Sequence, residues 1–139
     1  MGNVQFRSYA PEDFAPVIAL WQTCGLHPSR SDSAERLQHK QQRDPELFLV
    51  AEQDGRIVGT IMGSYDGRRG WINKLAVDAG QRGQGLARAL IAEVEQRLKA
   101  IGCDKVNLLI EADNAAVAGF YARLGYANDA LIFMEKWLA

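Results

Sequence analysis

The chain has 139 residues, of which 47% are hydrophobic and 24% charged, and its formal net charge is −1. This length suits one compact core, so we expect residues 1–139 to form a single domain. The near-neutral charge argues against a nucleic-acid partner, which usually meets a basic surface. No window approaches the roughly 20 apolar residues of a membrane span, and the N-terminus lacks a signal-peptide pattern, so we expect no membrane partner and a cytoplasmic location.

The cysteines and histidines do not form a metal-binding pattern. Cys24 and Cys103 lie far apart in the chain, and His27 and His39 do not have the spacing of zinc ligands. We therefore expect no metal, and we interpret both cysteines as reduced, buried thiols.

The chain begins with the pattern of a short strand and two helices. Residues 4–8 alternate as a strand does, and the Pro-Glu-Asp at 11–13 is typical of a helix start. Apolar residues at helical spacing predict a first helix after it, and a polar second helix is expected over about residues 33–43. Residues 25–33, rich in Gly, Pro, Ser and Asp, should form the loop between them.

A β-rich region and a long helix follow. Residues 47–78 contain three apolar runs separated by Asp-Gly turns at 54–55 and 66–67, which predicts an antiparallel meander. From Leu86 onward, apolar residues recur every three or four positions, so we expect an amphipathic helix that Gly102 closes as a left-handed cap.

The last third of the chain predicts strand, helix and strand. Residues 105–111 ("KVNLLIE") resemble a strand buried on both faces, and the long helix before them suits a parallel crossover. The next helix should have Asp113 or Asn114 as its N-cap and Gly125 at its end. A final strand is expected over residues 131–137, and the order β-α-α-β-β-β-α-β-α-β predicts an α/β sandwich around a mixed sheet.

The segment "RGQGLA" (82–87) joins a strand to the long helix and contains two glycines. Glycines there either let helix and strand pack closely, or leave the N–H groups of a helix N-terminus open to an anion. A P-loop is excluded because the required Gly-Lys is missing. A dinucleotide fingerprint is disfavoured because it needs a small residue where Arg88 stands.

These residues resemble the GNAT superfamily of N-acetyltransferases, whose central motif is Q/R-x-x-G-x-G/A after a strand. Arg82, Gly85 and Ala87 match that motif. Downstream, "NAAVAGFYARLGY" (114–126) is similar to the N-x-x-A-x-x-F-Y-x-x-x-G-F/Y segment of the same superfamily, with Val117 in place of alanine. The likeness covers residues 4–138 and looks nearest to the small bacterial YpeA-like branch.

The resemblance implies a GNAT-like three-layer α/β/α sandwich around a mixed, mostly antiparallel sheet with a central parallel pair of strands splayed apart. It also implies acetyl-CoA as cosubstrate, with its pyrophosphate on the backbone amides of the turn and its pantetheine along the preceding strand. Carried over to this chain, the expected cofactor-binding residues are Leu75, Ala76, Val77, Arg82, Gly83, Gln84, Gly85, Leu86, Ala87, Asn114 and Tyr121.

By the same resemblance, Tyr121 is the general acid that protonates the leaving thiolate. The other interpretation of Tyr121 is a packed aromatic residue beside Phe120. Asn114 has two expected roles, a helix N-cap and a ligand of CoA, which are compatible only if its oxygen and nitrogen divide the work. A backbone N–H of Leu75 or Ala76 is expected to stabilise the oxyanion.

The general base is the gap in the resemblance. Many family members carry a glutamate on the strand before the turn, whereas residues 71–78 ("WINKLAVD") have none in their middle. Asp78 and Glu111, at strand ends, are the alternatives that could act through water, although a solvated strand-end carboxylate is the favoured interpretation of each. Lys74 and Arg88 stay unassigned.

The implied activity is transfer of an acetyl group from acetyl-CoA to a primary amine, by direct attack in a ternary complex. The acceptor is a small molecule or a protein N-terminus or lysine, and residues 24–34 ("CGLHPSRSDSA") are expected to form part of its binding wall. Because the base is missing, a non-catalytic acyl-CoA-binding sensor of the same fold is the alternative. Exposed strand edges and the tail "ALIFMEKWLA" would allow a homodimer.

Overall fold

The structure is a computed structural model that describes residues 3–139, apart from the side chains of residues 112 and 113. The chain divides into two compact units, Met1–Leu109 and Ile110–Ala139. That residues 1–139 form one domain stays a prediction. No helix in the described part of the chain is long and apolar enough to cross a membrane.

The first unit is built on one five-stranded sheet with the order β1-β2-β3-β4-β5. All neighbours are antiparallel except β4 and β5, which run parallel. The sheet is therefore mixed and the fold α/β, which confirms the predicted class. The strands are β1 (Gln5–Ser8), β2 (Phe48–Gln53), β3 (Arg56–Tyr65), β4 (Gly70–Val77) and β5 (Val106–Leu108).

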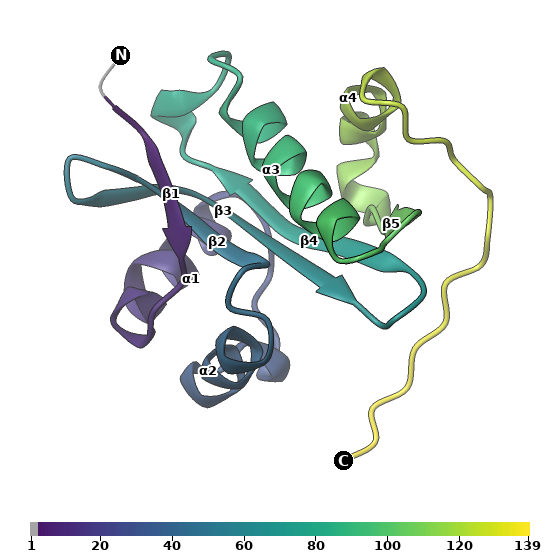
Figure 1. The fold of residues 1–139 in the computed structure, drawn as a ribbon, viewed down its shortest axis with the longest axis horizontal. Helices are drawn as coiled ribbons and strands as arrows, with labels where there is room; N and C mark the ends of the chain where they lie inside the picture. The colour runs from purple at the N-terminus through teal and green to yellow at the C-terminus, as the bar shows by residue number, and fades with distance from the viewer. Residues whose placement is uncertain (1–2) are drawn as a thin grey trace. The chain divides into compact units, whose positions relative to one another are not determined.

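Helices cover both faces of this sheet (Figure 1). Gly59 and Thr60 are adjacent on β3 and therefore point to opposite faces. A Cβ atom on Gly59 would lie 3.2 Å from Cδ1 of Leu90 in α3, whereas Thr60 bonds Trp21 of α1. The first unit thus has the predicted three layers, with helices α1 (Phe14–Thr23), α2 (Ala34–Arg43) and α3 (Leu86–Ala100).

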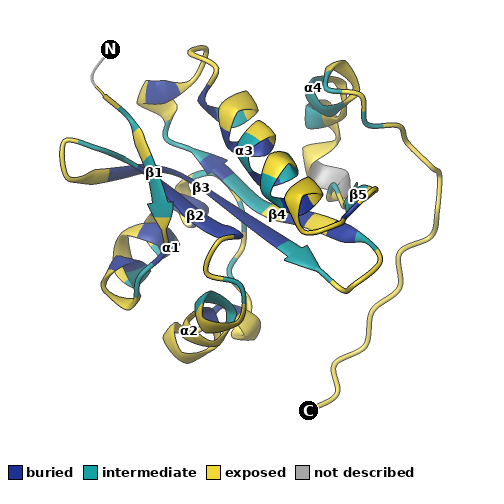
Figure 2. Cartoon of the chain, in the orientation of Figure 1, coloured by how far each residue is buried: buried dark blue, intermediate teal, exposed yellow. Residues whose placement is uncertain are grey.

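The first four residues of β2 and the middle of β3 form the most buried part of the sheet (Figure 2). On the α3 face, Gly63 allows the helix to approach closely, because a Cβ atom there would lie 2.8 Å from Cγ1 of Val94. On the α1 face, Trp21 and Phe48 are fully buried, and Tyr9 stacks on Phe48 with ring centroids 4.3 Å apart. These contacts hold α1 and α3 on opposite sides of β3 and β4.

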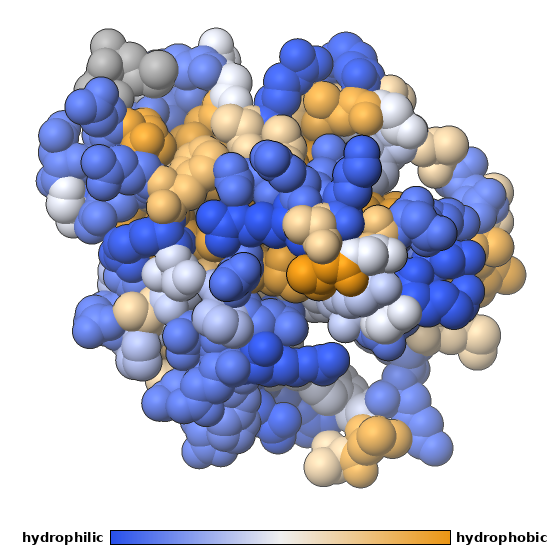
Figure 3. All heavy atoms as spheres, viewed as in Figure 1, coloured by the Kyte–Doolittle hydropathy of each residue, from blue (hydrophilic) through white to orange (hydrophobic). Residues whose placement is uncertain are grey.

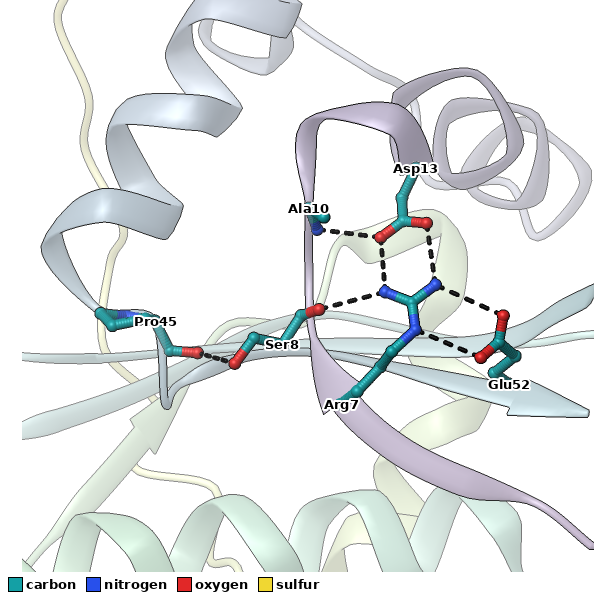
Figure 4. A network of polar contacts seen from close by, with 6 residues as sticks. All are labelled: Arg7, Ser8, Ala10, Asp13, Pro45 and Glu52. Carbon is teal, nitrogen blue, oxygen red and sulfur yellow. Dashed lines mark hydrogen bonds and ion pairs between the residues drawn. The ribbon is translucent and has the colours of Figure 1, made fainter. Parts of the chain in front are cut away.

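An ion-pair network fixes β1 against β2 and the start of α1 (Figure 4). The guanidinium of Arg7 donates to both carboxylate oxygens of Asp13, at 2.8 and 2.9 Å, and lies 3.3 Å from Oε1 of Glu52. Asp13 also accepts the backbone N–H of Ala10. Burial opposes the charged form of Asp13, but the hydrogen bonds from Arg7 and Ala10 outweigh it and hold the pKa of this carboxyl below its ordinary value.

The predicted ends of two helices are confirmed. Ser33 caps α2, since its hydroxyl accepts the N–H of Arg36 at 3.2 Å. Gly102 follows α3 with φ at 99°, the left-handed conformation expected of a closing glycine.

The strand predicted over residues 105–111 is shorter than expected, since β5 covers only Val106–Leu108 and is half-buried rather than buried on both faces. It pairs with β4 only from Gly70 to Ile72. The parallel pair is also an edge of the sheet, so its expected central place is corrected.

The second unit holds a 3-10 helix η4 (Ala112–Val117) and the helix α4 (Ala118–Arg123). The predicted N-cap at Asn114 is wrong, because Asn114 lies inside η4 with φ −118° and ψ 25°, and α4 begins only at Ala118. The side chain of Asp113, the other expected cap, lies outside the described residues. Gly125 follows α4 with φ at 96°, as predicted.

The strand predicted over residues 131–137 is wrong, since residues 127–139 contain no regular secondary structure. An apolar run forms a strand only where a neighbouring strand completes the ladder, and none pairs with this segment in the described chain. Figure 3 shows hydrophobic atoms in several separate areas of a largely hydrophilic surface. The exposed large apolar residues of the segment are Leu131, Ile132, Phe133, Met134, Trp137 and Leu138.

Candidate functional site

The strand β4 contains a β-bulge in its middle. Thr60 on β3 pairs with Ala76 on β4, and Met62 pairs with Asn73. The single β3 residue between Thr60 and Met62 therefore faces two residues of β4, 74 and 75. Lys74 adopts φ at 53°, a left-handed conformation that is uncommon for a residue other than glycine. Bulges and such strained residues concentrate next to functional sites, so β4 carries a candidate site at 73–77.

Buried hydrogen bonds hold the bulge in place. The indole N–H of Trp21 in α1 donates to Oγ1 of Thr60 at 2.8 Å, and the Thr60 hydroxyl donates to the backbone carbonyl of Lys74 at 2.9 Å. Both Trp21 and Thr60 are fully buried. The carbonyl of Lys74 is thereby fixed in direction, and so is the peptide that joins it to Leu75.

The side chain of Lys74 lies against the loop region between α1 and α2. Its Nζ lies 3.3 Å from Oδ2 of Asp32 and 5.0 Å from the ring centroid of Trp21. Asp32 ends a short 3-10 helix, η2 (Arg30–Asp32), whose N-cap Ser29 donates its backbone N–H to the same carboxylate at 2.9 Å. The structure thus brings part of the expected acceptor wall to the bulge of β4.

The edge of β4 beyond its pairing with β5 is the predicted path of the pantetheine. Within the first unit, residues 73–77 have no strand partner on this side among the described residues. Leu75 and Val77 are half-buried, and Ala76 is buried at 3% exposure. An open strand edge can hydrogen-bond an extended ligand that carries amide groups.

The turn between β4 and α3 is open to solvent. Gly83 and Gly85 have φ at 80° and 82°, and a Cβ atom on either would meet nothing within 4 Å. Close packing of helix on strand, which explains Gly63, therefore does not explain these two glycines. The backbone conformation requires them, and the space above the turn stays accessible.

The backbone amides of this turn point to no protein acceptor. The N–H groups of residues 83–88 make no hydrogen bond to any residue that the structure describes. Ala89 is the first to donate, to the carbonyl of Gly85 at 3.0 Å. Unpaired N–H groups and the positive end of a helix dipole are the features that can bind an anion.

Arg82, the first residue of the motif, is exposed and reaches back to β4. Its Nε donates to the carbonyl of Val77 at 3.4 Å, and its Nη2 lies 3.8 Å from Sγ of Cys24. The Cys24 thiol also donates to that carbonyl, at 3.4 Å. Sequence reasoning treated Cys24 as an isolated buried thiol, whereas the structure makes it half-buried and places it at the end of the strand edge.

The second unit presents the other two predicted residues. Asn114 is exposed, and its backbone N–H donates to the carbonyl of Glu111. Tyr121 is half-buried in α4, in edge-to-face contact with Phe120 and Tyr126 at ring-centroid distances of 5.2 and 5.8 Å. Burial raises the pKa of the Tyr121 hydroxyl, so it is protonated at neutral pH.

The two carboxylates considered as alternative bases differ in their contacts with the rest of the protein. Asp78 accepts the N–H of Gly80 at 3.1 Å and lies 3.8 Å from Arg56, so it caps the short 3-10 helix η3 (Ala79–Gln81) that precedes the turn. Glu111 is exposed at the start of η4. Lys74 is engaged by Asp32, while Arg88 is exposed in the first turn of α3.

Sequence reasoning missed the roles of Asp32, Trp21 and Thr60. Each lies in a different element, and the bulge that joins them has no signature in the order of apolar and polar residues in 70–77. The one available signal was the pair of polar residues, Asn73 and Lys74, in the middle of a mostly apolar strand.

The family comparison decides the class of this site. The Acetyltransferase (GNAT) family profile matches residues 14–126, which contain β4, the open turn and α4. The chain belongs to the GNAT acetyltransferase family. The expected N-acetyltransferase class is thereby confirmed, while the YpeA-like branch stays a prediction.

Individual relatives agree with this family. A curated acetyltransferase of Yersinia pestis (strain Pestoides F) is 43% identical over 135 residues, which cover 97% of this chain and 96% of the relative. The solved structure of Ard1 from Thermoplasma volcanium matches with a TM-score of 0.80 and 26% identity, over 91% of this chain and 84% of that one.

A second solved structure is the PaiA N-acetyltransferase from Thermoplasma acidophilum in complex with coenzyme A. It matches with a TM-score of 0.75 and 18% identity, over 88% of either chain. At this identity the likeness shows the fold alone. The GNAT fold of our chain is therefore one that has been observed with coenzyme A bound in another protein.

Proposed function

We propose that this GNAT family member transfers the acetyl group of acetyl-CoA to a primary amine by direct attack in a ternary complex. The observation that carries the proposal is the open turn at the start of α3, with unpaired N–H groups over residues 83–88. A pyrophosphate needs several such donors close together. Because residues 83 and 85 are glycines, no side chain obstructs the approach of an anion to these N–H groups.

The residues present fit acetyl-CoA. The turn from Arg82 to Ala87 would hold the pyrophosphate, and the open edge at Leu75, Ala76 and Val77 would bond the amides of the pantetheine as an added strand does. By the family resemblance, Asn114 is a further expected ligand of CoA, through its side-chain amide. When bound, acetyl-CoA supplies an activated acyl group as a thioester.

The chain's own residues would assist the transfer at two atoms of the substrate, the acetyl oxygen and the leaving sulfur. The amine nitrogen forms a bond to the acetyl carbon, the carbon–sulfur bond breaks, the nitrogen loses a proton and the thiolate gains one. A backbone N–H of Leu75 or Ala76, in the region that Thr60 holds in place, would stabilise the negative oxygen as it forms. The hydroxyl of Tyr121 would protonate the leaving thiolate.

Calorimetric titration with CoA and acetyl-CoA tests the proposal. We expect a dissociation constant below the millimolar range for both, and no detectable binding would reject the assignment of the turn. Thiol release in the presence of a panel of primary amines then separates an enzyme from a CoA-binding sensor, which would bind without turnover.

The ternary mechanism has its own test, because Cys24 lies at the end of the β4 edge. Mass spectrometry of the protein after incubation with acetyl-CoA alone should detect no acetylated cysteine, and initial rates should give intersecting lines for the two substrates. A Cys24→Ala variant should retain turnover. An acetyl group on Cys24 together with parallel lines would replace direct attack by a covalent relay.

A further inference from the structure

The ion pair of Asp32 and Lys74 is placed where an acceptor would meet the bulge of β4. Lys74 is the bulge residue itself, and Asp32 comes from residues 24–34, the segment expected to line the acceptor side. Nζ of Lys74 lies 3.3 Å from Oδ2 of Asp32. This position, next to Leu75 and Ala76, is beside the atoms proposed to stabilise the reacting carbonyl.

One carboxylate oxygen of Asp32 has its partners inside the protein. Oδ2 accepts the backbone N–H of Ser29 at 2.9 Å and lies 3.4 Å from the Ser29 hydroxyl, in addition to pairing with Lys74. These bonds keep the carboxylate in one orientation. Asp32 itself is only 8% exposed.

The other oxygen, Oδ1, is neither bonded within the described chain nor fully sealed from solvent. It makes no hydrogen bond to any residue of the described chain. It is also not among the polar side-chain atoms that are both sealed from solvent and unpaired, which in the described residues are Tyr9 Oη and Gln81 Oε1. An oriented, nine-tenths buried carboxylate with one accessible oxygen is therefore present at the bulge.

The charges around this oxygen restrict what can bind to it. The ammonium of Lys74 is held 3.3 Å from the same carboxylate, and its side chain keeps 22% of its surface exposed. An acceptor with only an ammonium group would approach Asp32 against the like charge of Lys74. An acceptor that also carries a carboxylate can pair its ammonium with Asp32 and its carboxylate with Lys74, so that each charge meets an opposite charge.

We propose that Asp32 and Lys74 bind the amine and the carboxylate of a zwitterionic acceptor, so that the substrate class is an amino acid or a close analogue. This rests on the proposed function, since it names the acceptor of the same reaction. The carboxylate of Asp32 accepts a hydrogen bond from the amine before and after the amine loses its proton. The amine thus stays in position for attack, while Lys74 fixes the other end of the molecule.

Matched substrates test the role of the carboxylate. Initial rates of thiol release are measured with L-amino acids of small, apolar, acidic and basic side chains, each beside its α-amide, which keeps the amine and loses the negative charge. We expect kcat/KM for the preferred amino acid to exceed that of its amide by about 10-fold or more, since a hydrogen bond to a charged group is lost.

Variants of Lys74 connect this preference to the structure. Lys74→Met should bring the ratio of amino acid to amide close to one and leave the KM for acetyl-CoA unchanged. Lys74→Arg, which retains the charge, should keep the preference for the amino acid. Lys99→Met, at an exposed position near the end of α3, is the matched control and should keep the full ratio. Thermal unfolding and CoA titration check that each variant is folded.

The outcomes separate this inference from the proposed function. Equal rates with amino acid and amide, or a ratio that survives Lys74→Met, overturn the acceptor assignment and leave acetyl transfer to amines standing. Binding of acetyl-CoA without turnover of any amino acid also overturns it. Absence of both CoA binding and turnover overturns the proposed function, and this inference with it.

Discussion

The indole N–H of Trp21 donates a 2.8 Å hydrogen bond to the hydroxyl of Thr60, and neither side chain is exposed to solvent. The hydroxyl of Thr60 in turn donates a hydrogen bond to the carbonyl of Lys74 at 2.9 Å. One buried hydroxyl therefore joins α1, β3 and the bulge of β4. Removal of this hydroxyl would leave the indole N–H and the Lys74 carbonyl without a hydrogen bond, because the site is buried and water cannot reach it unless the core opens.

We expect Thr60→Val, which preserves the shape of the side chain, to lower the free energy of unfolding by about 1–3 kcal/mol, because it leaves two buried polar groups unpaired. Urea unfolding followed by tryptophan fluorescence measures the change. Thr60→Ser retains the hydroxyl and is the control, with a loss of about 1 kcal/mol for the missing methyl group. Equal losses in the two variants would mean that the hydroxyl contributes little.

Local signals explain which parts of the fold could be predicted. The Asp-Gly turns at 54–55 and 66–67 and the apolar spacing from Leu86 act within a few residues, and the structure has both the meander and α3 at these places. The strand expected over 131–137 depended on a neighbour from elsewhere in the chain, which the apolar residues of the segment itself cannot reveal. For the same reason the length of β5 was overestimated.

The expected CoA side of the candidate site could be predicted from the sequence better than the acceptor side. The turn at 82–87 has a compact motif, because positive φ at Gly83 and Gly85 limits which residues can stand there. The acceptor side depends on Asp32 meeting Lys74 across a long stretch of sequence and on a bulge that has no sequence pattern. Long-range contacts of single charged residues therefore needed the structure.

A glutamate in the open turn should prevent binding of CoA. Gly85→Glu introduces a negative charge beside the N–H groups of residues 83–88 and fills the space that a pyrophosphate would occupy. Because no atom lies within 4 Å of the new Cβ, the folded state pays only the cost of a non-glycine residue at positive φ, about 1–2 kcal/mol. Calorimetry should detect no CoA binding to a protein that remains folded.

Gly67→Glu is the matched control for this change. Gly67 also has positive φ, at 96°, with nothing within 4 Å of a new Cβ, but it lies in the turn between β3 and β4. We expect a similar loss of stability and unchanged affinity for CoA. Equal affinities in both variants would show that CoA does not use the turn at Gly85.

The Asp13–Arg7 pair should make stability depend on acid pH. The pKa of Asp13 is lowered in the folded protein, so the stabilisation is complete above the pKa of about 3.9 that aspartate has in an unfolded chain. It is lost as the pH falls below about 4 through the lower folded value. Asp13→Asn should reduce the free energy of unfolding at neutral pH by about 1–3 kcal/mol and flatten this acid dependence.

Glu52→Gln is the comparison for Asp13. Glu52 contacts the same guanidinium at 3.3 and 3.5 Å, but its side chain is 32% exposed, against 7% for that of Asp13. Solvent screens this contact, so we expect a loss below about 1 kcal/mol. Urea unfolding at several pH values from 3 to 7 measures both variants, and a larger effect from Glu52→Gln would contradict the assignment.

Removal of the Tyr121 hydroxyl should slow the chemical step and spare binding. Tyr121→Phe keeps the ring contacts with Phe120 and Tyr126 while it removes the proton proposed for the leaving thiolate. We expect kcat to fall by about 100-fold or more, with the CoA dissociation constant nearly unchanged. Single-turnover measurements confirm that the chemical step is the one observed.

The raised pKa of Tyr121 gives a second readout for the same residue. Because burial moves this pKa above the ordinary value of about 10, the hydroxyl stays protonated through pH 9, and kcat should show no loss from this group below that pH. Tyr126→Phe is the control, since this position accepts either aromatic residue in the motif and should retain kcat. If Tyr121→Phe retains kcat while chemistry limits the rate, Tyr121 is a packing residue and the proton comes from another donor.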